Sequence, residues 1–421
     1  MALPVRDPLS FADQGSGCKS HGSSYHLGWL RCFLLGWVCI ALVISLTAVN
    51  LHGLVPQTDL PAKGSAAVAM AAERRGDFPE AVRSWTDIVA AKHPQAEAWA
   101  HLGFCLAQVG RYAEASDAYR AALQINPNLS GLALNLGLAE FKRGNFSGSI
   151  QALQLALRAK PDDEQVSVLL GMALFGNHEY DRAIEQLRKG VARDPTNAEL
   201  PLVLAQAYMG ARRYVEALPL FRSIIASNPD SVQAHMLAGE AEDALLNLPA
   251  AITDFKLARD ADPRHPNVHF GLGYLYFKAH EYPAALEEFN AELANDPSNA
   301  AALLYRGDVA LRQGRWDEAE RDLKRAQTME PGTRLVHLDL GIVFAQFKRH
   351  GDAEVEFKRA IALDASQADA HYRLGRLYAA TGRAALAKVE FEKTKEIRDA
   401  GNPLLVDQLP VSPAPSASPL P

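Results

Sequence analysis

Histidines at a fixed spacing are the first candidates for chemistry in this sequence of 421 residues. Four of them are separated by 34 or 68 residues: His235, His269, His337 and His371. Histidine is the commonest metal ligand in proteins, so the row could indicate metal binding. If the row lies on successive packed helices, its members are at least about 8–10 Å apart, whereas a metal–nitrogen bond measures about 2 Å. One ion cannot bridge two members, and we expect interface histidines and no metal site.

No other set of side chains forms a catalytic motif. The sequence contains no phosphate-binding loop, no GxSxG and no HExxH. Acidic pairs such as Glu287–Glu288 and Asp162–Asp163 fall at expected helix or turn surfaces, where hydrated carboxylates are the ordinary outcome. We therefore predict a protein that is not an enzyme, with no catalytic residue, no cofactor and no evident small-molecule substrate.

The cysteines and the net charge exclude further classes of site. The four cysteines show no spacing typical of zinc ligands, and Cys105 is expected to pack as a small apolar side chain. The formal net charge is −6, and the sequence lacks the basic clusters that bind nucleic acid. We expect no nucleic-acid partner.

The elements that carry these residues recur every 34 residues. In the clearest copy, Ala96 to Asn128, apolar residues at helical spacing predict two helices joined by a turn at Gly110 and ended at Pro127. A small residue early in the second helix recurs as Ala81, Ala115, Ser149, Ala183, Ala217, Ala251, Ala285, Ala319, Ala353 and Ala387. A bulky residue four positions later recurs as Trp85, Tyr119, Leu153, Leu187, Phe221, Phe255, Phe289, Leu323, Phe357 and Phe391. Small residues let paired helices approach closely, and the bulky ones fill the space between pairs.

A Leu-Gly pair in the first helix keeps the same step, as at Leu102–Gly103 and Leu136–Gly137. A helix–turn–helix period of this length with these columns resembles the tetratricopeptide repeat family. The resemblance covers residues 62–401, or ten repeats. It implies an all-α fold, a right-handed superhelical solenoid of antiparallel helix pairs.

An uncharged segment precedes the repeats. Eighteen residues from Cys32 to Val49 carry no charge, and with their apolar flanks they reach the roughly 20 residues that a transmembrane helix needs. We predict a disordered polar leader (1–26), one N-terminal transmembrane anchor (27–55), a linker (56–61), the solenoid (62–401) and a disordered Pro/Ser-rich tail (402–421). A cleaved signal peptide is the alternative, although Leu46 then stands where a small residue is preferred.

Basic residues flanking the segment predict its orientation. Lys19 and Arg31 precede it closely, whereas Lys63 follows at a distance. The positive-inside bias places the N-terminus in the cytoplasm. We expect a single-pass membrane protein whose repeats are extracytoplasmic, or periplasmic if the source is bacterial.

The family resemblance also implies a binding surface, because first helices of successive repeats line an inner groove that binds protein or peptide segments. Twelve apolar residues are expected in this groove: Leu134, Leu138, Phe141, Val168, Met172, Phe175, Leu202, Met209, Met236, Phe270, Tyr274 and Phe277. The groove turns acidic at Glu240 and Asp243, and becomes mixed at Asp308, Arg312, Tyr372, Arg373 and Arg376. We expect Met172 and Phe175 to be uncovered in the free protein, the alternative being that packing of the array already buries them.

These features predict a membrane-anchored scaffold that binds a segment of a partner protein in its groove. A secreted or periplasmic form after signal cleavage is one alternative. An architectural or accessory subunit of a larger assembly or enzyme complex is another.

Overall fold

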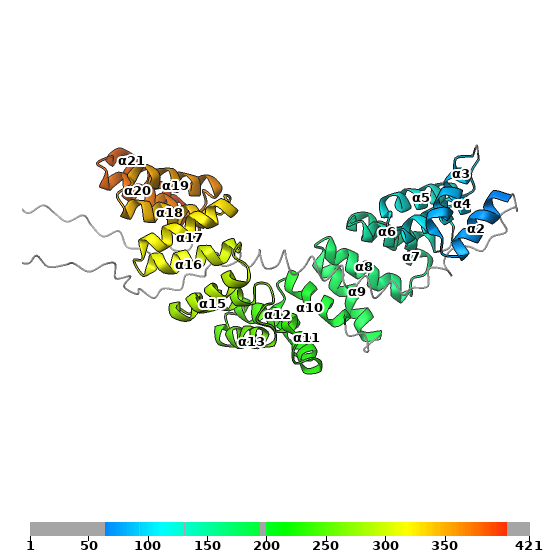
Figure 1. Ribbon diagram of the computed structural model, residues 1–421, viewed down its shortest axis with the longest axis horizontal. Coiled ribbons are helices and arrows are strands. Elements are labelled where there is room, and N and C mark those ends of the chain that lie inside the picture. The colour runs from blue at the N-terminus through cyan, green and yellow to red at the C-terminus, as the bar shows by residue number, and fades with distance from the viewer. Residues whose placement is uncertain (1–63, 92, 130, 194–198, 402–421) are drawn as a thin grey trace, which may run out of the picture. The chain divides into compact units, whose positions relative to one another are not determined.

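The computed structural model describes residues 64–401, except for 92, 130 and 194–198. This part of the chain contains twenty α-helices, α2 to α21, and no strand (Figure 1). The predicted leader, transmembrane anchor, linker and tail lie outside the described residues. Within the described ranges, no helix has both the length and the apolar character that a membrane span requires.

The chain divides into two compact units at the bond between Arg213 and Tyr214. The first unit contains α2 (Gly64–Arg74), α3 (Phe78–Val89), α4 (Ala96–Gln108), α5 (Tyr112–Ile125), α6 (Leu132–Lys142), α7 (Phe146–Ala159), α8 (Glu164–Gly176), α9 (Tyr180–Arg193) and α10 (Leu200–Gly210). The second contains α11 (Tyr214–Ser227), α12 (Val232–Ala244), α13 (Leu248–Ala261), α14 (Val268–Lys278), α15 (Tyr282–Asn295), α16 (Ala300–Arg312), α17 (Trp316–Met329), α18 (Arg334–Gln346), α19 (His350–Leu363), α20 (Ala368–Ala380) and α21 (Ala384–Gly401).

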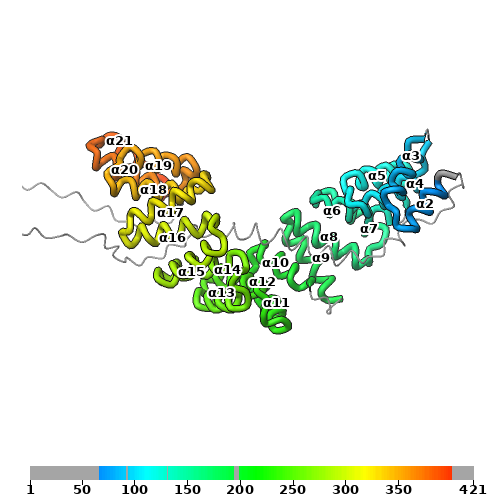
Figure 2. Tube along the Cα trace, in the orientation of Figure 1, coloured from blue at the N-terminus to red at the C-terminus, as the bar shows by residue number. Residues whose placement is uncertain are grey.

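Within each unit, every helix packs against its neighbours in the chain (Figure 2). The even-numbered helices are the first helices of the repeats, and successive first helices also contact one another, as α14, α16 and α18 do. Within each unit, side chains of the first helices therefore form a surface that continues from one repeat to the next.

The small and bulky columns pack as the sequence predicts. All ten small residues are buried, with at most 4% of the surface exposed. The bulky side chains press on the glycine of the Leu-Gly pair: a Cβ atom on Gly103 would lie 2.7 Å from the Tyr119 ring. Nine of the ten bulky residues are at most 2% exposed, and Phe391 in α21, the last described helix, is 37% exposed. Close approach of paired helices thus depends on the missing side chain at this position.

The turn between paired helices uses a left-handed residue at the same position of every repeat. Glycine occupies it five times, as at Gly110 with φ +77° and Gly314 with φ +72°. The other five are His178, Arg212, Leu246, His280 and Lys348, with φ between 59° and 64°. Residues with a Cβ atom adopt this conformation at a cost, so these five turns are strained relative to the glycine turns.

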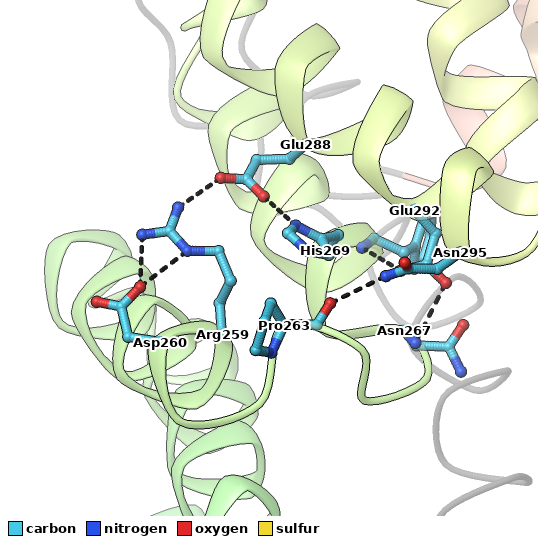
Figure 3. Close-up of polar contacts among 9 residues, drawn as sticks. Arg259, Asp260, Pro263, Asn267, His269, Glu288, Glu292 and Asn295 are labelled. Carbon is cyan, nitrogen blue, oxygen red and sulfur yellow. Dashed lines mark hydrogen bonds and ion pairs between the residues drawn. The ribbon is translucent and has the colours of Figure 1, made fainter.

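The histidine row connects helices, as the sequence predicts. Nδ1 of His269, His337 and His371 each lies 2.6 Å from a glutamate of the following helix. Figure 3 shows one example, in which Glu288 contacts His269 and also accepts a 2.7 Å hydrogen bond from Arg259. Glu288 is only 6% exposed, so the prediction that it is a hydrated surface carboxylate is wrong. Two basic partners from neighbouring helices compensate its burial.

Candidate partner-binding surface

Most of the apolar residues predicted for the groove are covered. Eight of the twelve are at most 8% exposed: Leu134, Phe141, Val168, Met172, Phe175, Met209, Met236 and Phe270. Leu138, Leu202, Tyr274 and Phe277 are half-buried. The expectation that Met172 and Phe175 are uncovered in the free protein is wrong, since they are 1% and 4% exposed. A role of these twelve residues in partner binding stays a prediction.

In the first unit, aromatic side chains of the second helices cover residues that were predicted to line the groove. The aromatic residues that begin α7 and α9 lie over the ends of the preceding first helices: Phe146 is 5.3 Å from Phe141 and Tyr180 is 5.9 Å from Phe175, between ring centroids. Val168 packs instead on the second helix of its own repeat, where a Cβ atom on Gly190 would lie 2.6 Å from it. The helix α8 is apolar nearly all round, and such helices are normally covered on all sides.

Two buried amides in the first unit lack hydrogen-bond partners. Asn135 on α6 is 3% exposed and Gln206 on α10 is fully buried. Neither the side-chain oxygen nor the nitrogen of either residue bonds to any described residue. Most buried polar atoms are paired in folded proteins, so these two amides are exceptions within the described part of the chain.

In the second unit, side chains from four successive first helices form a continuous surface. We call it the second-unit face and define it by Tyr274, Phe277, Lys278, Tyr305, Asp308, Arg312, Asp339 and Arg373. Its centre is aromatic: the Tyr305 ring lies 5.2 Å from Tyr274 and 5.3 Å from Phe277, between centroids. Tyr274 and Phe277 from α14 and Tyr305 from α16 thus form one ring cluster that remains partly accessible.

Charged groups frame these rings. Lys278 forms an ion pair with Asp243 and lies 5.8 Å from the Tyr274 ring. Arg312 donates two hydrogen bonds to Asp308, at 2.9 and 3.1 Å, and its guanidinium lies 5.1 Å from the Phe277 ring. Burial, with a smaller contribution from the Asp243 carboxylate, raises the pKa of Tyr274 to about 12. The face therefore already places cations against aromatic rings, which attract them through the ring quadrupole.

Sequence reasoning placed part of this face and missed the rest. Tyr274, Phe277, Asp308, Arg312 and Arg373 were expected on it. Tyr305, Asp339 and Lys278 were not. Tyr305, Asp339 and Arg373 are spaced 34 residues apart, one position after the column that contains Phe270. This regular spacing is the sequence signal that could have placed Tyr305 and Asp339 on the second-unit face.

A pocket outside the second-unit face is lined by residues of α15, α16 and α17 in the same unit. One of them, Arg306, stands where other repeats have the leucine of the Leu-Gly pair and donates two hydrogen bonds to Asp322 at 2.7 and 2.8 Å. It also donates one to Asn290 at 2.8 Å. These bonds satisfy the guanidinium, so we interpret it as structural.

Several solved structures are similar to this chain. The chain is similar to a protein of the crystal structure of the "APC/C hetero-tetramer Cut9-Hcn1", with 13% identity, a TM-score of 0.47, and 78% of this chain and 79% of that chain covered. It is similar to a tetratricopeptide repeat protein from Parabacteroides merdae ATCC 43184, with 17% identity, a TM-score of 0.48, and 58% and 96% of the two chains covered. It is also similar to YrrB, titled "a TPR protein with an unusual peptide-binding site", with 20% identity, a TM-score of 0.37, and 42% and 92% covered.

No curated protein sequence is significantly similar to this chain. Family models give a direct assignment. Models described as tetratricopeptide repeat match residues 96–129, 134–198, 174–242, 270–333, 306–367 and 338–394. These matches together span more than half of the sequence, and they coincide with the helix pairs described above. The chain belongs to the tetratricopeptide repeat family.

Proposed function

We propose that this chain is a non-enzymatic scaffold of ten repeats that binds an extended segment of a partner protein along its first helices. The observation that carries the proposal is the second-unit face, where the partly accessible rings of Tyr274 and Phe277 adjoin Tyr305 and the charged groups of α16 to α20. Aromatic residues and arginine are enriched in the buried centres of protein interfaces. Surfaces of this composition are typical of protein recognition.

The proposal is tested by truncating one ring of the second-unit face. The full-length protein, extracted in detergent, is used for affinity purification as wild type, as Phe277→Ala and as Val355→Ala. Val355, on the second helix α19, is 64% exposed and serves as the matched control. We expect the proteins that co-purify specifically with the wild type to be lost with Phe277→Ala and retained with Val355→Ala. Equal recovery with all three would reject the second-unit face as the binding surface.

We propose further that residues 27–55 tether the scaffold to a membrane, with the repeats on the extracytoplasmic side. The support is the uncharged run from Cys32 to Val49. The full-length protein should remain in the membrane pellet after alkaline carbonate washing, and protease added outside the membrane should digest the repeats. Release of a soluble form that begins near Val49 would establish signal cleavage instead.

A further inference from the structure

One carboxyl group on the second-unit face is buried without a hydrogen bond or an ion pair to the described residues. Asp339, in the middle of α18, is 8% exposed. It makes no hydrogen bond and no ion pair with any residue in the described part of the chain. Burying a carboxylate without a partner is costly, because the group loses its hydration and gains nothing in return. Asp339 therefore destabilises the free protein, which calls for an explanation.

The arginines nearest to Asp339 are already engaged. Arg312 donates both of its hydrogen bonds to Asp308. Arg334 donates two to Asp369, at 2.7 and 3.1 Å. Burial raises the pKa of Asp339 well above its usual range, and the carboxylates of Asp308 and Asp369 raise it further, against the opposing charges of Arg312 and Arg334. Around Asp339, the three carboxyl groups of Asp308, Asp339 and Asp369 thus share the two guanidinium groups of Arg312 and Arg334.

Arg373 on α20 is a further cation in this region, and Arg376 lies near it. Among described residues it makes no hydrogen bond or ion pair, and its pKa is lowered by burial and by the neighbouring charge of Arg376. The charge of Asp339 acts on Arg373 in the opposite direction, so the two groups are near each other without direct contact. The carboxyl of Asp339 thus remains an open acceptor on the second-unit face.

We propose that Asp339 binds the ammonium or guanidinium group of a lysine or arginine in the partner segment. This inference rests on the proposed function and specifies the chemistry of its ligand. Charge complementarity carries it, because a desolvated carboxylate is best compensated by a cation that also donates hydrogen bonds. The neighbouring ring cluster can hold the methylene stem, just as Tyr274 and Phe277 already lie against Lys278 and Arg312.

The test selects ligands from a random dodecapeptide library with the detergent-extracted full-length chain. Three forms are compared: wild type, Asp339→Asn and Asp317→Asn. Asp317 is an exposed residue at the start of α17, and its substitution removes the same single charge away from the second-unit face. We expect wild type to select peptides with lysine or arginine at one fixed position. Fluorescence anisotropy with the strongest selected peptide should show at least about tenfold weaker binding to Asp339→Asn and unchanged binding to Asp317→Asn.

Thermal unfolding of the same variants shows whether weaker peptide binding results from a folding defect. Because asparagine has no charge to bury, the midpoint of Asp339→Asn should equal or exceed that of wild type. A lower midpoint would show that the carboxylate is bonded within the free protein, and would overturn the inference. If Asp339→Asn still selects peptides with lysine or arginine at the same position, the inference about Asp339 is also overturned. Binding of a peptide segment by the protein would still be supported in that case. If wild type selects no peptide, the proposed function and this inference fail together.

Discussion

Truncation of two buried residues on α8 gives the sharpest test of the packing described above. Phe175 and Met172 are 4% and 1% exposed, and the Phe175 ring also makes an edge contact with Tyr180 at 5.9 Å between centroids. Replacing a buried phenylalanine or methionine with alanine removes apolar burial and leaves a cavity, at a cost of about 3–5 and 2–5 kcal/mol respectively. The ring contact adds about 0.5–1.5 kcal/mol to the value for Phe175. We therefore expect both single variants to be strongly destabilised.

The measurement is thermal and urea unfolding followed by circular dichroism. For a unit of this size, a loss of 3–5 kcal/mol lowers the unfolding midpoint by roughly 6–20 °C. Leu155→Ala is the matched control, since Leu155 lies on α7 of the same unit and is 42% exposed. Its midpoint should change by an amount equivalent to about 0.5 kcal/mol or less. If Phe175→Ala and Met172→Ala unfold like the control, the two side chains face solvent and the packing inferred for the first unit is wrong.

Three further predictions concern the turns, the histidine row and the substituted Leu-Gly pair. Leu246→Gly should stabilise the protein by up to about 1 kcal/mol, because Leu246 is 82% exposed at φ +64° and glycine adopts this conformation without strain. The converse change Gly110→Ala should destabilise it by about 1 kcal/mol in urea unfolding, although its Cβ would meet no atom within 4 Å. His337 lies 2.6 Å from a Glu356 oxygen and 2.9 Å from the Pro331 carbonyl oxygen, so both ring nitrogens must donate, and the pKa of His337 is raised chiefly by the hydrogen bond with Glu356. Since the folded pKa lies above the unfolded value of about 6.5, this stabilisation is complete below that pH and is lost as the pH rises through the folded pKa. The stability difference between wild type and His337→Gln in urea should therefore shrink from pH 6 to pH 9, and a constant difference would contradict an imidazolium. Arg306→Leu should cost about 3 kcal/mol by leaving Asp322 buried at 6% exposure without its arginine, and Arg306→Leu/Asp322→Ala should recover most of that loss in the same assay.

The repeat fold could be predicted from the sequence because the residues that recur every 34 positions are those required by the close packing of paired helices. The glycine at Gly103 leaves room for the bulky Tyr119 side chain where two helices approach closely, and a small residue facing a bulky one recurs at these two positions along the repeats. The exposure of the first helices could not be predicted in the same way. Periodicity shows which residues share a face, but the cover over Phe141 comes from Phe146, whose direction depends on the turn between the helices.

The candidate site was predicted in part for a related reason. Tyr274 and Phe277 lie with Phe270 on an apolar stripe at helical spacing, which the sequence displays. Asp339 occupies a neighbouring column, and one residue along a helix rotates the side chain by about 100°, so the apolar stripe did not indicate Asp339. Its significance depends on Arg312 and Arg334 being engaged elsewhere, which is a property of three-dimensional contacts. Glu288 shows the same limit, because its two basic partners come from two other helices.

The central claim is that a partner segment lies along the first helices, and site-specific photocrosslinking tests it most directly. A benzophenone amino acid would be introduced at Phe277 on the second-unit face, or at Val355 or Leu257 on second helices, where 64% and 47% of the side chain is exposed. The protein is irradiated in its own cells and the crosslinked products are identified by mass spectrometry. The account predicts a crosslinked partner polypeptide from position 277 and none from positions 257 and 355. Crosslinks of equal yield from all three positions, or from the second helices alone, would contradict it.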